Sequence, residues 1–434
     1  MSQKIKLGLT RNRLFSFDNA VTFVGEYKTS FDVSEVKKAL KMLCLKEPVI
    51  TSDILLENDG TAYVVTESVN IQLEIAEGSV EDYLNKITAN GFDFNRQLFS
   101  FALINGNTLV ICGHTVVCDG NSLLNLAKEL LEFYNKKNLS VESNDIILFS
   151  DKSQLPLNIN SPVVDRLSSD LEVGWQKKTA FFSFEDYKTA RGKYFENKGR
   201  VQSEKKELSA DMLNKLKRFS RENKVDVSSI VAFSFYKGLY EVLKEKRSVA
   251  KMNVISNERV FFENFANMSV GPFNGVVTVE NKLKKGDDKS LKGQAISFHK
   301  EIYKRLTSSF SVFYNENILM NVPGSFCDSA YMYTAGQFKH KYSKRLAEIY
   351  GCNNRKIGEF GSYNLDQHYY DVLKEFVNIE VSEPLKMRSY SFITFTQNNG
   401  KGFVSFKWNT NKLSTKNVEE ITDISRKILS DLTE

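Results

Sequence analysis

Hydrophobic and polar positions along the chain follow two different spacings. In four segments apolar residues recur every three or four positions, which predicts amphipathic helices at 36–43, 123–134, 212–219 and 418–432. Short runs of apolar and β-branched residues predict strands at 61–66, 97–103, 108–112 and 252–255. Helices that alternate with strands in this way indicate an α/β (α+β) fold.

Cap and turn residues mark where these elements begin and end. The expected helix caps are Asp32 or Ser34, Ser209, and Ser228 or Ser229. Near the carboxyl end, Asn398-Asn399-Gly400 separates apolar runs at 392–396 and 403–408. An Asn-Gly pair between two such runs predicts a β-hairpin.

The length of the chain and one polar segment together indicate two domains. A chain of 434 residues exceeds what one hydrophobic core usually serves. The segment 150–165 contains Pro156, Pro162 and several Ser and Asn residues without a helical period. We therefore expect it to connect an N-terminal lobe, residues 1–165, to a C-terminal lobe, residues 166–434.

The most informative segment runs from the end of a predicted strand into a predicted helix, and it reads Cys112-Gly113-His114-Thr115-Val116-Val117-Cys118-Asp119-Gly120-Asn121-Ser122. Gly120 permits a tight turn, and Asn121 or Ser122 is expected to cap the helix. An imidazole, His114, and a carboxylate, Asp119, thus share one strand-to-helix corner. Such a corner can hold a general base against an acceptor group.

This corner resembles the His-His-x-x-x-Asp-Gly signature of the chloramphenicol-acetyltransferase-like superfamily, in particular the condensation domains of nonribosomal peptide synthetases and their free-standing relatives. When the two are aligned on Asp119-Gly120, His114 occupies the first His of the signature. Thr115 occupies the second, which is the catalytic one in the family. The sequence therefore keeps the frame of the site and lacks its usual base.

Further segments in the same order extend the resemblance over nearly the whole chain. They are 92–99 for the family's Phe-Asp-Leu segment, 253–259 for its strand-and-Arg motif, 270–277 for its Val-Gly-Pro-Phe segment, 328–333 for a strand and 390–408 for the closing hairpin. The segment 270–277 lacks the family's second Asn and its Pro. The resemblance implies two lobes that form a V-shaped pseudo-dimer, with the active site in the central cleft.

The resemblance also implies an activity. A protein of this kind transfers an acyl group from a thioester, on coenzyme A or on a carrier-protein phosphopantetheine, to an amine or hydroxyl acceptor. The donor is then a substrate, no permanently bound cofactor is implied, and an acyl or peptidyl carrier protein is a candidate partner. The alternative is a module that has lost catalysis and binds an acyl-pantetheine, a carrier protein or a partner enzyme, and Thr115 favours it.

Several residues of the motif allow more than one role. His114 is either the base of the reaction or a core histidine bonded to the backbone, and the family's first His supports the site. By resemblance, Asp119 shapes the site by pairing with an Arg of the second lobe, and Arg259 is the candidate. Thr115 has no useful basicity near neutral pH, so it can only donate or accept a hydrogen bond. Cys118 is either a thiol nucleophile activated by His114 or a small buried residue.

Other residues of these segments are expected to line a substrate channel, because ligand cavities are mostly apolar with a few polar anchors. The channel candidates are Cys118, Ser122, Phe273, Asn274, Tyr331 and Tyr333. The aromatic members would otherwise belong to the core. His299, His340 and His368 lie outside the motif, and we expect them at the surface.

Composition narrows the remaining classes of function. The net charge of +6 is modest, and no nucleic-acid-binding module is recognisable, so we expect no nucleic-acid partner. A positive surface suits the phosphates of a pantetheine donor or an acidic carrier protein equally well.

The four His and five Cys residues show no metal-binding spacing, so we expect no metal site. No apolar run approaches the roughly 18 residues of a membrane span. With no targeting segment at the start of the sequence, a cytoplasmic location is expected.

Overall fold

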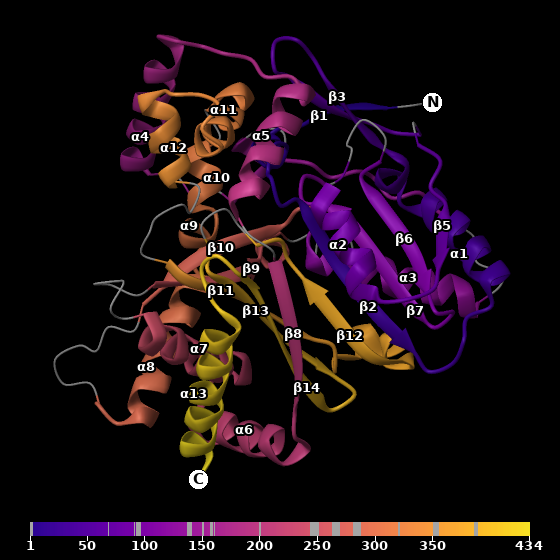
Figure 1. The fold of residues 1–434 in the computed structure, drawn as a ribbon, viewed down its shortest axis with the longest axis vertical. Helices are drawn as coiled ribbons and strands as arrows, with labels where there is room; N and C mark the ends of the chain where they lie inside the picture. Colours follow the sequence, from indigo (N-terminus) through magenta and orange to yellow (C-terminus); the bar gives the residue numbers. More distant parts are fainter. Residues whose placement is uncertain are drawn as a thin grey trace.

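The fold is described from a computed structural model of the chain. It describes residues 3–67, 69–90, 92, 97–136, 141–149, 152–156, 159, 161–198, 201–243, 251–262, 270–280, 288–319, 322–349, 356–385 and 389–434. These residues form two large sheets, each covered by helices, which we call the N-terminal lobe and the C-terminal lobe (Figure 1). The mixture of helices and strands confirms the predicted α/β (α+β) class.

The N-terminal lobe is built on a five-stranded sheet in the order β12-β2-β7-β6-β5. Its strands are β2 (Ala20–Tyr27), β5 (Leu73–Ala76), β6 (Phe99–Ile104), β7 (Thr108–His114) and β12 (Phe376–Ser382). The helices α1 (Val33–Lys46) and α3 (Gly120–Asn135) bury the larger core on one face, and α2 (Val80–Asn90) covers the other. A separate small sheet contains β1 (Lys4–Lys6), β3 (Asp53–Leu56) and β4 (Ala62–Val65).

The C-terminal lobe is built on a six-stranded sheet in the order β10-β9-β11-β13-β14-β8. Its strands are β8 (Val201–Leu208), β9 (Lys251–Asn257), β10 (Asn274–Val279), β11 (Lys356–Asn364), β13 (Ser391–Asn398) and β14 (Lys401–Asn409). Its core is covered by α6 (Ala210–Asn223), α7 (Val227–Leu243), α8 (Leu291–Leu306) and α13 (Thr415–Thr433).

Local sequence signals account for several of these boundaries. Asp32 caps α1 and Ser209 caps α6, as predicted, by accepting backbone N–H groups in the first turn. The helix α7 begins at Val227, one residue before its expected cap. The hairpin of β13 and β14 is confirmed, with Asn399 and Gly400 both at the positive φ that its tight turn requires.

A third, smaller core joins four helices beside the two lobes: α4 (Pro162–Gln176), α10 (Tyr314–Leu319), α11 (Gly324–Thr334) and α12 (Lys341–Ile349). Trp175 stacks on Phe326 at its centre, with 4.8 Å between the ring centroids. The predicted strand at 328–333 is wrong, because these residues form most of α11. Phe326 and Ala330 lie one helical turn apart and bury the same face, so packing selects the helix.

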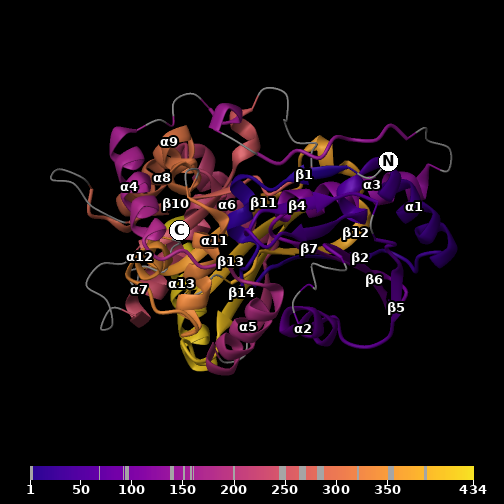
Figure 2. The same cartoon turned by 90° about the horizontal axis from the view of Figure 1, so that it is seen from above.

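One strand from late in the chain completes the N-terminal sheet. β12 pairs antiparallel with β2, with Val381 opposite Phe23. The chain therefore returns to the N-terminal lobe after building most of the C-terminal sheet, and the division at residue 165 remains a prediction. α2 and α5 (Phe184–Lys198) lie near each other where the two lobes meet (Figure 2).

Candidate functional site

The strand-to-helix corner is organised by Asp119 and Gly120. Asp119 is the cap of α3, and its Oδ1 accepts from the N–H of Ser122 at 2.8 Å. The expected cap at Asn121 or Ser122 is therefore corrected, and Ser122 instead completes a capping box. Gly120 is not in the left-handed region, so its role is not the turn that we expected. It provides space, because a Cβ there would lie 2.1 Å from the Tyr363 hydroxyl.

Asp119 and Arg259 form a buried ion pair between the lobes. Nη1 of Arg259 donates to Oδ2 of Asp119 at 2.7 Å, and Nη2 donates to Oδ1 at 3.1 Å. Both side chains are buried, and the guanidinium also donates to the Ser122 hydroxyl and lies over the ring of Phe273. The pair that the resemblance implied is present, and it joins the start of α3 to the segment after β9.

His114 is buried beneath this corner. Its Nδ1 accepts from the N–H of Val116 at 3.0 Å, which fixes the ring against its own turn. Burial, with a smaller contribution from the charge of Arg191, lowers the pKa of His114 to about 3. The side chain does not line the cavity between the lobes, whereas its neighbour Thr115 does. A neutral, enclosed imidazole is well suited to support the turn.

The lowered pKa of His114 predicts a pH dependence of stability. The unfolded chain binds a proton near the ordinary pKa of 6.5, whereas the folded protein leaves His114 neutral down to about pH 3. Stability should therefore fall as the pH drops below 6.5, at up to about 1.4 kcal/mol per pH unit. We expect the His114→Gln variant to lack this contribution to the pH dependence of the free energy of unfolding, measured by urea denaturation between pH 4 and pH 8.

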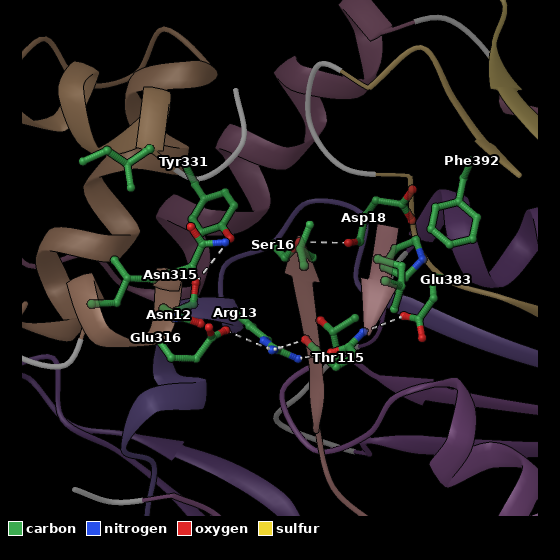
Figure 3. A pocket seen from close by; sticks show the side chains of 16 residues that line it. Asn12, Arg13, Ser16, Asp18, Thr115, Asn315, Glu316, Tyr331, Glu383 and Phe392 are labelled. Atoms are coloured by element: carbon green, nitrogen blue, oxygen red, sulfur yellow. Dashed lines mark hydrogen bonds and ion pairs between the residues drawn. The ribbon is translucent and has the colours of Figure 1, made fainter. Parts of the chain in front are cut away.

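The central cavity lies between the lobes and encloses about 130 Å³ (Figure 3). Thr115 of the motif faces it together with the channel candidates Asn274 and Tyr331. Its remaining lining is Asn12, Arg13, Ser16, Asp18, Ile255, Val276, Asn315, Glu316, Leu319, Ile349, Glu383, Pro384 and Phe392. Thr115 is mostly buried, and its hydroxyl has no hydrogen-bond partner among the described residues. The position that holds the base in the family thus lies at the cavity wall.

The other channel candidates, Cys118, Ser122, Phe273 and Tyr333, do not line the central cavity. Ser122 is buried within the Asp119–Arg259 network, and Phe273 is buried against Arg259 and Phe149. Tyr333 packs against the small helical core. These side chains hold the walls of the site in place. Of the segment 92–99, residues 93–96 lie outside the described residues.

Cys118 is a core residue. It is fully buried, and its thiol donates to the His114 carbonyl at 3.3 Å. Burial, strengthened by the nearby charges of Asp119 and Glu383, raises the pKa of this thiol well above its usual range. This environment opposes the thiolate that a nucleophile requires.

We therefore expect the Cys118 thiol to be unreactive in the folded protein. Iodoacetamide followed by mass spectrometry should modify Cys118 only after unfolding, whereas the partly buried Cys44 should react earlier. Cys118→Ser should change any acyl transfer by less than about twofold, since its sulfur only packs. Rapid labelling of Cys118 in the native protein would contradict this assignment.

Glu383, Asp18 and Arg13 are cavity residues that the sequence analysis did not identify. Glu383 accepts from the N–H of Gly120 at 2.8 Å and from the Asn274 amide at 3.2 Å. Nη1 of Arg13 donates to Oδ1 of the Asn274 amide at 2.6 Å. The only sequence signal for Glu383 is a carboxylate directly after an apolar strand, and nothing local marked the other two.

Two further cavities share residues with the central one. The α3 cavity, about 360 Å³, lies at the start of α3 and shares Ile255, Asn274 and Glu383 with it. The α2 cavity, about 780 Å³, lies between α2, α5 and β8 and shares Asp18 with it. The central cavity, which Thr115 lines, is therefore adjacent to both of these cavities.

The remaining sequence expectations concern histidines, metals and membranes. His299 is buried and contacts the Ser229 hydroxyl at 3.1 Å, so its expected surface position is corrected, whereas the side chain of His368 is fully exposed. Within the described ranges, no group of three or more His, Cys, Asp or Glu side chains is arranged to hold a metal. No helix in those ranges is long and apolar enough to cross a membrane.

Several solved structures, among them domains of nonribosomal peptide synthetases, share this architecture. The EpoB cyclization-docking bidomain of a nonribosomal peptide synthetase from Sorangium cellulosum matches with a TM-score of 0.61 and 13% identity, over 99% of this chain and 84% of that chain. The first condensation domain of the calcium-dependent antibiotic synthetase, with a substrate analogue, matches with a TM-score of 0.63 and 11% identity, over 99% and 97%. Polyketide synthase associated protein 5 from Mycobacterium tuberculosis matches with a TM-score of 0.57 and 12% identity, over 99% and 100%.

These matches confirm the predicted condensation-domain-like fold over nearly the whole chain. No family model matches the sequence, and no curated protein sequence matches it significantly. At 11–13% identity the likeness concerns the fold, so function must be argued from the site itself.

Proposed function

We propose that the protein is a condensation-like acyltransferase that joins an acyl thioester to an acceptor in the central cavity. The observation that carries this proposal is the sharing of cavity residues. Glu383 and Asn274 also face the α3 cavity, and Asp18 also faces the α2 cavity. A site for one ligand needs one route of entry. A transfer between two substrates needs two routes that lead to the same place. The proposed meeting point is the central cavity, which Thr115 lines.

In the proposed reaction, the acceptor nitrogen or oxygen attacks the thioester carbonyl carbon. The new bond forms as the carbon–sulfur bond breaks, and the thiol leaves with the proton that the acceptor gives up. Coenzyme A or a carrier-bound phosphopantetheine serves as donor. Arg13 is the cation on the cavity wall that can stabilise the oxyanion, and it is partly held by Asn274.

The absence of a base at Thr115 favours an amine acceptor over a hydroxyl. A neutral amine attacks a thioester without prior deprotonation, whereas a hydroxyl needs a base in the transition state. Thr115 cannot take that proton near neutral pH. The rate then rests on holding donor and acceptor in contact, which by itself can supply a large part of an enzyme's acceleration.

A second candidate function is a binding module without turnover. Two observations favour it: the cavity wall has Thr115 where the family has its base, and His114 is neutral and enclosed. Such a module would hold an acyl-pantetheine, a carrier protein or a partner enzyme in the same cleft.

The test is to incubate the protein with an acyl-pantetheine and a set of amines, and to follow amide formation by mass spectrometry. Val276→Phe should reduce transfer at least about tenfold, because it fills the cavity beside Thr115. The matched control Val377→Phe adds the same ring at an exposed position of β12 and should have no effect. If the protein binds the thioester but transfers no acyl group, the result supports the binding module. If it neither binds the thioester nor transfers an acyl group, the proposal is overturned.

A further inference from the structure

A buried ion pair connects the short helix η1 (Leu9–Arg13) to α11. Nη1 of Arg11 donates to Oδ1 of Asp328 at 2.7 Å, and Nη2 donates to Oδ2 at 2.5 Å. Nε of Arg11 also donates to the carbonyl of Gly60 at 3.2 Å, and both charged side chains are buried. Two parallel hydrogen bonds between a guanidinium and a carboxylate fix the relative orientation of both groups. The pair therefore attaches η1 to α11 in a defined geometry.

One face of α11 is shaped to receive η1. Gly324, Asp328 and Tyr331 follow one another at spacings of four and three residues, which places them on the same face of the helix. Gly324 leaves room for Arg11, because a Cβ at this glycine would lie 2.7 Å from Cγ of Arg11. The Tyr331 hydroxyl donates to the Asn12 carbonyl at 3.2 Å. This face of α11 thus contacts both the side chain of Arg11 and the backbone of the next residue.

The other side of η1 carries Arg13 to the wall of the central cavity (Figure 3). η1 is a 3₁₀ helix with three residues per turn, so side chains two residues apart leave it on different sides. Arg11 therefore meets α11, whereas Arg13 meets β10 and donates to the Asn274 carbonyl at 3.1 Å as well as to its side chain. The orientation of η1 decides where the Arg13 guanidinium lies.

The ion pair is better explained by orientation than by stability. A buried ion pair is often no more stabilising than well-packed apolar side chains, because both charges lose their hydration. α11 also has an apolar core of its own, centred on the stacked rings of Trp175 and Phe326. What apolar side chains do not provide is the directed, two-bond geometry that fixes η1 relative to α11.

We infer that Asp328 is a positioning residue for acyl transfer: by holding Arg11, it fixes η1 in the orientation that places Arg13 against the developing oxyanion. The inference rests on the proposed function, in which Arg13 stabilises this charge. It extends the site to a buried carboxylate that does not itself line the central cavity.

Hydrogen exchange followed by mass spectrometry tests whether Asp328 holds η1. Asp328→Asn keeps the size of the side chain and replaces an acceptor with a donor that faces Arg11, so it disrupts the two-bond geometry. Backbone amides of residues 9–16 should exchange at least about tenfold faster in this variant, because η1 opens more often. The matched control Ser168→Ala removes a buried hydrogen bond to the Ile318 carbonyl in the same group of helices and should leave this exchange unchanged.

Kinetics test whether this contact acts through Arg13. With an acyl-pantetheine and an amine, Asp328→Asn should lower kcat about tenfold and change the KM of the thioester by less than about twofold, because the oxyanion forms only in the transition state. When Arg13→Met is already present, Asp328→Asn should cause no further loss of kcat. A role in stability alone would give the same loss in both backgrounds.

Unchanged exchange of residues 9–16 in Asp328→Asn would overturn the inference, and so would an equal loss of kcat with and without Arg13. If Asp328→Asn does not fold, Tyr331→Phe removes only the hydroxyl bonded to Asn12, and effects of about threefold are expected in the same two measurements. A native protein that transfers no acyl group would contradict the proposed function, whereas the exchange measurement tests the contact with η1 independently.

Discussion

Replacing Arg259 with Met should lower the free energy of unfolding by about 3–5 kcal/mol, because Asp119 would remain as a buried charge without its partner. The carboxylate is fully buried and accepts hydrogen bonds from Nη1 and Nη2 of Arg259. Solvent cannot replace these bonds, because water does not reach the buried oxygens. The helix cap would be affected too, since Asp119 also begins α3. Urea denaturation followed by circular dichroism measures the loss.

Two comparisons make this result specific to the buried pair. Arg426→Met removes an exposed partner of Asp423 and should cost less than about 1 kcal/mol. Combining Arg259→Met with Asp119→Ser should restore part of the stability, because Ser keeps a cap and removes the stranded charge. A denaturation midpoint equal to that of the native protein would show that the pair does not contribute.

Thr115→His should raise the rate of acyl transfer to a hydroxyl acceptor by about 10²–10⁴ if the cavity holds both substrates in productive geometry. The native side chain lies at the cavity wall beside Asp18 and Glu383, so a ring placed there would meet the acceptor. The gain should appear in the rate at saturating substrate. It should also introduce a titration near the ordinary pKa of His, about 6.5, which the native protein lacks at this site.

Thr115→Asn is the matched control, because it introduces a polar side chain of moderate size without a base. It should leave the rate near that of the native protein. If Thr115→His binds an acyl-pantetheine and still forms no product, the missing base is not what limits the protein. The binding module would then be the better description.

Local sequence determined the helices α1, α3, α6 and α13 and the hairpin, because their signals lie within a few residues. The spacing of Val36, Leu40 and Leu43 and the cap at Asp32 are sufficient for α1, and Asn399-Gly400 is sufficient for the turn between β13 and β14. The resemblance also identified Asp119 and Arg259 as partners, although they lie far apart in the chain. The strand predicted at 328–333 was wrong, because the short apolar pattern of this segment fits a strand as well as a helix. Only contact with α4 and α12 selects the helix.

Which side chains face the cavity was decided by the tertiary structure alone. His114 and Thr115 are neighbours in one motif, yet the first packs into the turn and the second reaches the cavity wall. Asp18 and Glu383 come from opposite ends of the chain, and they share this wall because β12 crosses over to pair with β2. The motif determines the frame of the site by local geometry. Its chemistry depends on charged side chains from distant parts of the sequence, which the folded structure brings together. No local pattern encodes such long-range contacts.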